Sequence, residues 1–405
     1  MAVNLPPLPA LHPVAGIRLG TTRAQIRKKD RRDLVVIECV AGTQAAAVFT
    51  KNRFCAAPVS VAREHLAQTA PRALLINTGF ANAGTGPEGL DDARRSCAAL
   101  ATIMDCAPHA VLPFSTGVIG ERLPIERLVA GLPVCHRALS EDGWAEAAHG
   151  IMTTDTLPKG SSRRVQIDGK TVTVTGIAKG AGMICPNMAT LLAFIATDAS
   201  VPSAILQQCL SAAADESFNR ISVDGDTSTN DACVLLATGK SGLNLRAAEG
   251  AAFQAFYDNV REVLAELAQS IVRDAEGATK FITIDVMQGA SQDDCLEVAY
   301  TIAHSPLVKT AFFASDPNWG RILAAIGRAR IPQLQVDRVS IYLDDVCIVR
   351  HGGRAPEYSE AQGQAVMARS EIGVRVELGS GKASARLWTC DLSHDYVTIN
   401  AEYRT

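Results

Sequence analysis

Threonines next to small residues are the side chains of this sequence best suited to act as nucleophiles. They stand at Thr116 before Gly117, in the pair Thr153-Thr154, and at Thr190 after Pro-Asn-Met-Ala. A threonine hydroxyl attacks a carbonyl carbon only when a base removes its proton. No histidine adjoins any of these threonines in the sequence, so the base has to come from elsewhere.

Cleavage of the peptide bond before a threonine would create such a base. The new α-amino group lies within reach of the hydroxyl of the same residue and can accept its proton. Its unperturbed pKa of roughly 7.7–8.0 suits proton transfer near neutral pH, whereas that of a lysine amine is ~10.4. A self-cleaved chain with an amino-terminal threonine is therefore a chemically economical hypothesis.

Other common catalytic signatures are absent from the sequence. It has no GxxxxGK[ST] phosphate loop, no strand-to-helix GxGxxG motif, no GxSxG and no HExxH. The eight histidines are dispersed without a second ligand at metal-site spacing, and SVDGDTSTND lacks the final glutamate of a calcium loop. We expect no metal and no resident cofactor.

The composition is that of an ordinary globular protein. Its 405 residues predict two to three domains, with 47% hydrophobic and 20% charged residues. The net charge of −3 does not favour nucleic acid or an anionic membrane as a partner. The longest apolar runs reach about half of the ~20 residues that a membrane span needs. With no signal peptide and eleven scattered cysteines, we expect a cytoplasmic protein that binds small molecules.

Helical and strand-like patterns alternate along the chain, which predicts an α/β or α+β fold. Helices are predicted at 88–106, at 203–216 with Ser203 as the N-cap, and at 246–274. Period-two runs predict hairpins at 165–174, turning at Asp168-Gly169, and at 339–349, turning at Asp344-Asp345. A third hairpin is predicted at 374–388, turning near Gly379–Gly381.

The segment AKGAGMICPNMATLLAFIATDA, from Ala178 to Ala199, resembles the cleavage-site segment of the ArgJ family. These proteins are glutamate N-acetyltransferases of arginine biosynthesis, also called ornithine acetyltransferases. Further segments that resemble the family follow in order over nearly the whole chain: INTGFANAGTG, STGVIG, IMTTDT, FNRISVDGDTSTND, RDAEGATKF, SDPNWGRILAAIGRA and CDLSHDYVTINAEYRT. The sequence departs from the family pattern at Phe80, Cys185 and His394, none of which removes a reacting group. Cys185 is not expected to be a nucleophile, because no histidine is at hand.

The resemblance implies self-cleavage between Ala189 and Thr190, giving an α chain of residues 1–189 and a β chain of residues 190–405. Thr190 would then be the nucleophile, with its freed α-amine as the general base. It would take the acetyl group of N2-acetylornithine, release ornithine, and pass the acetyl group to glutamate in a ping-pong reaction. The match at STGVIG assigns the oxyanion hole to the Thr116 hydroxyl and the Gly117 N–H group.

The resemblance also implies which residues bind substrate. N2-acetylornithine carries a carboxylate and an ammonium group, so the family positions Lys179 and Glu276 would supply the opposite charges. Of the Thr153-Thr154 pair we favour Thr153. The implied substrate-binding residues are Thr153, Lys179, Thr190, Glu276, Asn400 and Thr405. Neighbouring polar residues are expected in buried ion pairs and ordered loops instead: Asp274, Lys280, Asp316 and Arg321.

The architecture implied is a layered α/β fold with sheets sandwiched between helices, shared with certain self-cleaving aminopeptidases. We expect a break between a larger and a smaller lobe near residue 280, with the carboxyl-terminal tail returning to the site. The intertwined cleavage products should stay together as an α2β2 heterotetramer. No residue decides whether acetyl-CoA also serves as a donor.

Two other functions fit some of the same observations. An N-terminal-nucleophile aminopeptidase or amidohydrolase would use the same threonine but pass its acyl group to water. A non-enzymatic metabolite-binding protein with this fold would keep an uncleaved chain.

Overall fold

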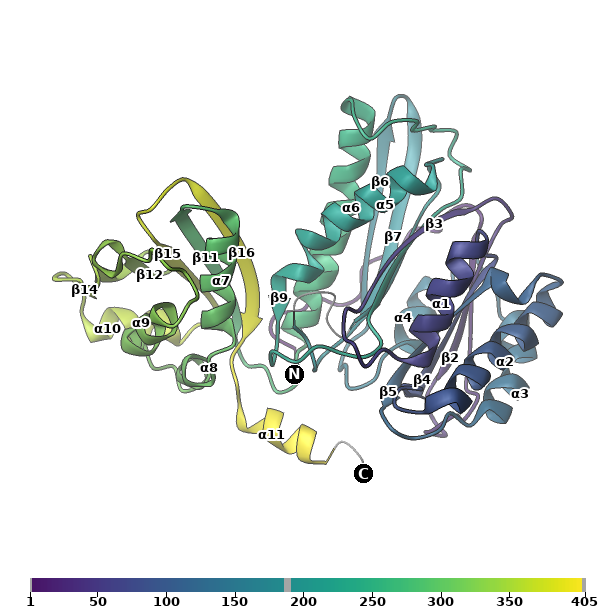
Figure 1. Ribbon diagram of the computed structural model, residues 1–405, viewed down its shortest axis with the longest axis horizontal. Helices are drawn as coiled ribbons and strands as arrows, with labels where there is room; N and C mark the ends of the chain where they lie inside the picture. The colour runs from purple at the N-terminus through teal and green to yellow at the C-terminus, as the bar shows by residue number, and fades with distance from the viewer. Residues whose placement is uncertain (1, 186–190, 403–405) are drawn as a thin grey trace.

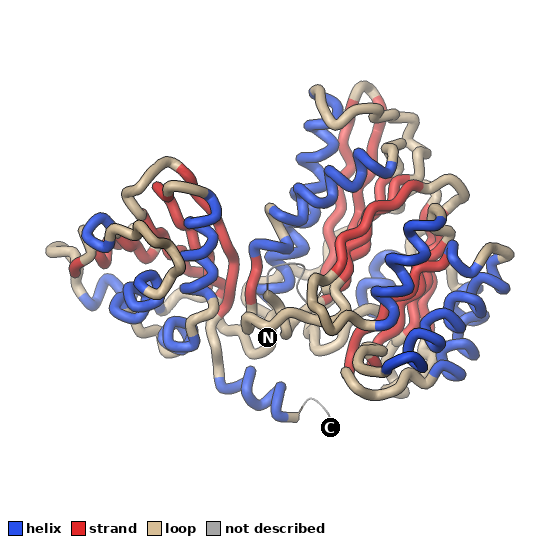
Figure 2. The backbone as a smooth tube through the Cα atoms, in the orientation of Figure 1, coloured by secondary structure: helices blue, strands red, loops and turns tan. Residues whose placement is uncertain are grey.

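Three β-sheets organise the part of the chain that the computed structural model describes, residues 2–185 and 191–402. Their strand orders are β1-β2-β4-β5, β3-β10-β8-β7-β6 and β14-β13-β12-β15-β11-β16-β9. Figures 1 and 2 show the first two sheets and their helices as one body, and the third sheet with its helices as a second body beside it.

The first sheet and its helices come from the amino-terminal third of the chain. The strands are β1 (Ile17–Thr22), β2 (Leu34–Cys39), β4 (Ala73–Phe80) and β5 (Val111–Val118). The helices are α1 (Ala57–Gln68), α2 (Gly86–Met104), α3 (Ile125–Arg137) and α4 (Trp144–Gly150). Alternate residues of β2 point to opposite faces, so Val36 packs against α2 and α3 while Val35 and Ile37 face the second sheet.

The second sheet packs its inner face on the first. Its strands are β3 (Gln44–Phe49), β6 (Lys159–Ile167), β7 (Lys170–Lys179), β8 (Leu192–Thr197) and β10 (Ala232–Ala237). Phe114 of β5 meets Phe194 of β8 edge to face between the sheets, with ring centroids 5.1 Å apart. Helices α5 (Ser203–Asp215) and α6 (Ala251–Arg273) cover the outer face. The layers therefore run helix, sheet, sheet, helix, which confirms the expected layered α/β architecture.

The third sheet carries helices on one face. Its strands are β9 (Ile221–Ser222), β11 (Phe281–Gly289), β12 (Ser340–Leu343), β13 (Val346–Arg350), β14 (Gly353–Arg354), β15 (Glu371–Glu377) and β16 (Ala383–Cys390). The helices are α7 (Gln292–Ala303), α8 (Pro306–Phe313), α9 (Trp319–Gly327) and α10 (Glu360–Met367), and a last helix, α11 (His394–Ala401), extends back toward the first body (Figure 1). No helix in the described part of the chain combines the length and apolar character needed to cross a bilayer.

The predicted helices and two of the predicted hairpins are confirmed. Helices α2, α5 and α6 occupy the predicted segments, although Pro202 and not Ser203 takes the N-cap position of α5. Strands β6 and β7 pair through Ile167 and Lys170 around the Asp168-Gly169 turn. Strands β12 and β13 pair through Leu343 and Val346 in the same way.

The third predicted hairpin is wrong, because another strand lies between its two arms. Strand β11 pairs in parallel with β15 and antiparallel with β16, so these two strands are not neighbours. The connecting loop crosses the end of β11 and is fixed there by backbone hydrogen bonds, from Leu378 N–H to Met287 O and from Gly381 N–H to Gln288 O. A central apolar strand can form hydrogen bonds along both of its edges. The alternating pattern within β15 and β16 does not reveal that a third strand separates them.

A buried ion triad ties the start of β6 to the end of α6. The Lys159 ammonium lies 2.7 Å from Asp155 Oδ1 and 2.7 Å from Asp274 Oδ2, and all three side chains are at most 1% exposed. Burial alone would raise the pKa of Asp155, but the charges of Lys159 and Lys179 hold it below its usual value. The Asp155 contribution to stability is therefore present at neutral pH and is lost as the pH falls through the depressed pKa.

Replacing Lys159 with methionine should leave two buried carboxylates without their counter-ion. We expect Lys159→Met to lower the free energy of unfolding by about 3–5 kcal/mol at pH 7, measured by urea denaturation. The control is Lys170→Met, since Lys170 is exposed at the start of β7 and its loss should change stability by at most about 0.5 kcal/mol. A Lys159→Met protein as stable as its parent would show that the triad does not stabilise the fold.

Candidate active site

One cavity collects every predicted site residue that the structure describes. It has a volume of about 240 Å³ and lies where the first two sheets meet the loop after α6 and the helix α11. Its walls include Thr116, Gly117, Thr153, Lys179, Glu276 and Asn400, together with Thr154, Ser228 and Asn230. Ala189, Thr190 and Thr405 lie outside the described residues.

Thr116 and Gly117 occupy the carboxyl end of β5, where β5 pairs with β4. Gly117 has a φ of +135°, and a Cβ atom there would overlap the backbone of Gly79. Asn230 holds the two strand ends together, because its amide donates to Ala81 O at 2.6 Å and to Ser115 O at 2.9 Å. The close approach of the two strands therefore requires glycine at position 117.

The Lys179 side chain reaches Thr116 from the end of β7. It is buried, with a residue exposure of 3%, and its ammonium donates to Thr116 Oγ1 at 3.2 Å. Burial lowers the pKa of Lys179, while the carboxylate of Asp155 opposes that shift. Because the Thr116 oxygen accepts this hydrogen bond from Lys179, the hydroxyl proton of Thr116 is available for donation to a group in the cavity.

Glu276 and Asn400 bring two distant parts of the chain to the same wall. Glu276 follows α6, and its backbone N–H donates to Ala181 O at 2.9 Å. Asn400 Nδ2 on α11 donates to Glu276 Oε2 at 2.9 Å. A Cβ atom at Gly182 would overlap the Glu276 carboxylate, so glycine there lets the charge approach the loop. The cavity thus has an ammonium group on one wall and a carboxylate on another.

The buried triad positions these walls. Asp155 accepts hydrogen bonds from Thr153 N–H and from Gly180 N–H, each at 2.8 Å. One carboxylate therefore fixes the threonine pair and the residue that follows Lys179. Asp274, two residues before Glu276, accepts from Thr156 N–H at 2.9 Å. The ion pair expected for Asp274 is confirmed.

The other polar residues expected outside the site order loops and contact backbone groups. Lys280 donates to the Met367 and Arg369 carbonyls, and Arg321 donates to the Leu307 carbonyl. Asp316 accepts from the Asn318 amide at 3.0 Å. The loop-ordering role expected for these three residues is confirmed.

Asp231, the last residue of the SVDGDTSTND segment, is a buried acid that the sequence analysis did not single out. Its Oδ1 accepts from Leu191 N–H at 3.1 Å, and its Oδ2 is buried without a hydrogen-bond partner among the described residues. Burial raises the pKa of Asp231 well above its ordinary value. The position of an acid directly before the apolar run ACVLLA was the only sequence signal for this burial.

A histidine does lie beside Cys185, contrary to the expectation. His304 Nε2 is 3.8 Å from Cys185 Sγ, although the two residues are 119 positions apart. Burial raises the pKa of the Cys185 thiol to about 12 and lowers that of His304 to about 4. Both shifts oppose a thiolate–imidazolium pair, so the environment disfavours Cys185 as a nucleophile for a different reason from the one expected.

No group of three histidine, cysteine or acidic side chains in the described part of the chain is arranged to hold a metal ion. The cavity walls carry threonine and serine hydroxyls, a buried ammonium group, a carboxylate and amide groups.

Comparison with known proteins identifies the family. The model of the ArgJ family matches residues 18–405. The arginine biosynthesis bifunctional protein ArgJ of Pseudomonas syringae pv. tomato is 57% identical over 406 residues, covering 100% of both chains. The protein of the same name from Methylococcus capsulatus is 61% identical over 395 residues, covering 98% of this chain and 97% of that one.

A crystal structure of the ArgJ protein from Bacillus halodurans is also similar. It shares 37% sequence identity, covers 51% of this chain and 97% of that chain, and superposes with a TM-score of 0.49. The family model and the full-length relatives are sufficient without it: this chain belongs to the ArgJ family.

Proposed function

We propose that this protein is an acetyltransferase of arginine biosynthesis that moves the acetyl group of N2-acetylornithine to glutamate. The observation that carries the proposal is the convergence of Thr116, Lys179 and Glu276 on one cavity, at positions that match family motifs. Relatives at 57–61% identity are named arginine biosynthesis bifunctional proteins.

The nucleophile is Thr190, freed by cleavage after Ala189. Its hydroxyl attacks the acetyl carbonyl while its α-amine takes the proton. The C–N bond of the amide then breaks, the proton passes to the departing nitrogen, and ornithine leaves an acetyl ester behind. The glutamate amine attacks that ester and restores the hydroxyl. The fixed backbone of Leu191, which follows Thr190, supports the assignment of Thr190 as the nucleophile. Leu191 N–H donates to Asp231, and Leu191 O accepts from Ala232 N–H.

Negative charge develops on the carbonyl oxygen in both half-reactions. The Thr116 hydroxyl and the Gly117 N–H group are the donors that stabilise it. Donation from Lys179 to the Thr116 oxygen supports this role, because it leaves the Thr116 proton for the oxyanion. The rigid pairing of β4 and β5 keeps both donors in place before substrate arrives.

Charged groups of the substrate meet opposite charges on the cavity walls. Lys179 binds the carboxylate and Glu276 the ammonium group of acetylornithine, with Thr153, Asn400 and Thr405 as further contacts. The Asn400 amide supports this arrangement, since its hydrogen bond to Glu276 fixes one carboxylate oxygen and leaves the other for substrate.

The relatives are named bifunctional proteins, which supports a second donor, and we propose that this donor is acetyl-CoA. The two chains produced by cleavage stay associated, and two such pairs form an α2β2 heterotetramer. The cysteines of the described chain are free thiols, which supports a cytoplasmic location.

Loss of the nucleophile should abolish both maturation and transfer. We expect Thr190→Ala to remain a single chain of 42.8 kDa under denaturing conditions and to release no ornithine in the presence of glutamate. Thr190→Ser keeps a hydroxyl and should give two chains, the second beginning at residue 190, by intact mass and amino-terminal sequencing. Turnover by the alanine variant would refute the nucleophile assignment. Release of acetate without glutamate by the parent protein would instead indicate an amidohydrolase.

Loss of one oxyanion donor should slow the chemistry more than it weakens binding. We expect Thr116→Ala to reduce kcat by about 10²–10³-fold with a much smaller change in KM, measured by steady-state kinetics of ornithine release. Thr116→Ser restores the donor and should recover most of the rate. An unchanged kcat in the alanine variant would exclude Thr116 from the oxyanion hole.

A further inference from the structure

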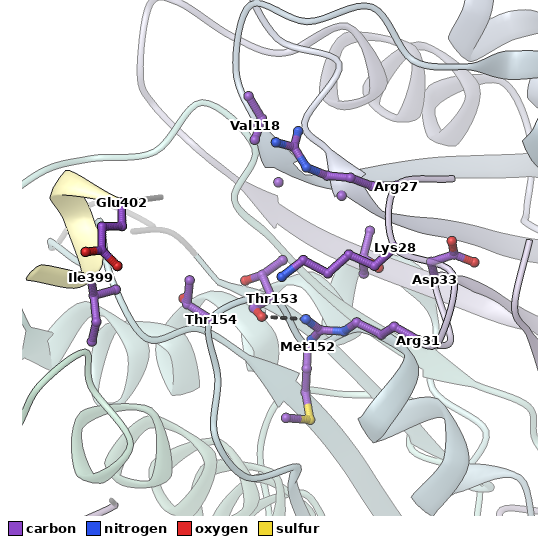
Figure 3. Close-up of a pocket in the computed structure, with 13 residues that line it drawn as sticks. Arg27, Lys28, Arg31, Asp33, Val118, Met152, Thr153, Thr154, Ile399 and Glu402 are labelled. Atoms are coloured by element: carbon purple, nitrogen blue, oxygen red, sulfur yellow. Dashed lines mark hydrogen bonds between the residues drawn. The ribbon is translucent and has the colours of Figure 1, made fainter. Parts of the chain in front are cut away.

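A second cavity adjoins the candidate active site and is lined by basic residues. Its volume is about 230 Å³, and it shares Gly117, Val118, Thr153 and Thr154 with the first cavity. A ligand held at the oxyanion donors can therefore extend past the threonine pair into this second space. Figure 3 shows side chains that surround it; the lining residues come from the β1–β2 loop, the ends of β4 and β5, the loop of residues 152–154, and the carboxyl-terminal end of α11 with Glu402.

The β1–β2 loop contributes Arg27, Lys28 and Arg31 to this cavity. Lys28 extends across the space toward Thr153 (Figure 3) and has no hydrogen-bond or ion-pair partner among the residues that the structure describes. Arg31 has a structural task, because its guanidinium donates to Thr153 O at 2.6 Å. Arg27 lies over the Phe80 ring, 5.4 Å from its centroid, and 3.4 Å from the partly exposed Glu121 carboxylate.

Two carboxylates of the described residues, Asp33 and Glu402, also line the cavity, and no ion pair joins either of them to Lys28. Asp33 is buried and accepts from the backbone N–H groups of Ala24 at 2.7 Å and Ile26 at 2.5 Å. Its charge thus orders the loop that carries Lys28. Glu402, just after α11, lies on the opposite side of the cavity (Figure 3). The cavity therefore presents an ammonium group on a loop that is itself held in place.

The proposed ping-pong reaction requires a second cation, such as the Lys28 ammonium group, near the first cavity. Both amino acids must bring their α-amines to the same nucleophile, but ornithine ends in an ammonium group and glutamate in a second carboxylate. In the first cavity Lys179 is assigned to one carboxylate, and the charge of Glu276 repels another. The second carboxylate of the acceptor therefore needs a cation elsewhere.

We infer that the second cavity binds the side-chain carboxylate of the acetyl acceptor, a dicarboxylic amino acid, and that Lys28 is its main contact. This inference rests on the proposed function. Arg27, which is paired with Glu121, lines the same cavity, and Arg31 keeps the Thr153 wall in position. Lys28 is thus a specificity-determining residue of the second half-reaction.

The test compares Lys28→Gln with Lys29→Gln. Lys29 is the adjacent lysine; it is exposed, as Lys28 also is, but it does not line either cavity. We expect Lys28→Gln to lower kcat/KM for glutamate at least about tenfold, the loss of one charged hydrogen bond, and to reduce the preference for glutamate over glutamine as acceptor. Ornithine release from acetylornithine without glutamate, a single turnover, should stay within about twofold. Lys29→Gln should leave all of these rates unchanged, and Lys28→Arg should recover most of the preference.

Three outcomes would overturn the inference. An unchanged preference for glutamate over glutamine would show that Lys28 does not contact the acceptor carboxylate. An equal loss in both half-reactions would indicate a structural role. A higher KM for acetyl-CoA with unchanged kinetics for glutamate would assign the cavity to a phosphate of the thioester donor. A cleaved parent protein that transfers no acetyl group would refute the proposed function itself.

Discussion

The burial of one ammonium group, that of Lys159, is the constraint on which the arrangement of the site depends. A charge removed from water must be balanced at close range, and Asp155 and Asp274 do this from two different segments. Each carboxylate has further oxygen lone pairs, which accept hydrogen bonds from the backbone N–H groups of Thr153, Thr156 and Gly180. The same electrostatic requirement that closes the core therefore sets the positions of the cavity walls.

Much of the local structure could be predicted from sequence because its causes are local. The Asp168-Gly169 turn and the helical spacing of α6 depend on residues within one segment, and both are found as expected. The arms of the third hairpin also form strands, but their separation by β11 depends on a segment about 90 positions earlier. Periodicity predicts that a strand forms and does not identify its neighbour.

The site shows the same division. Thr116, Lys179, Glu276 and Asn400 were identified by resemblance, and the structure brings them together, although their roles stay predictions. Asp231, Lys28 and Lys159 were not singled out, because their significance depends on burial and on contacts across the fold. The Cys185–His304 contact joins positions 119 residues apart, so no local spacing could reveal it.

The strand order of the second sheet has a consequence for the origin of this chain as one polypeptide. Strands β8 and β10, which follow Leu191, lie in the interior of the sheet between β3 and β7, which precede Cys185. Without β8 and β10, β3 has no neighbouring strand in its sheet, and β7 keeps only β6 as a neighbour. Two separate genes for the two segments would encode chains that each expose open strand edges until they meet. A single reading frame removes that hazard, since the strands are synthesised together and the sheet can be completed before the proposed cleavage in the connection between β7 and β8.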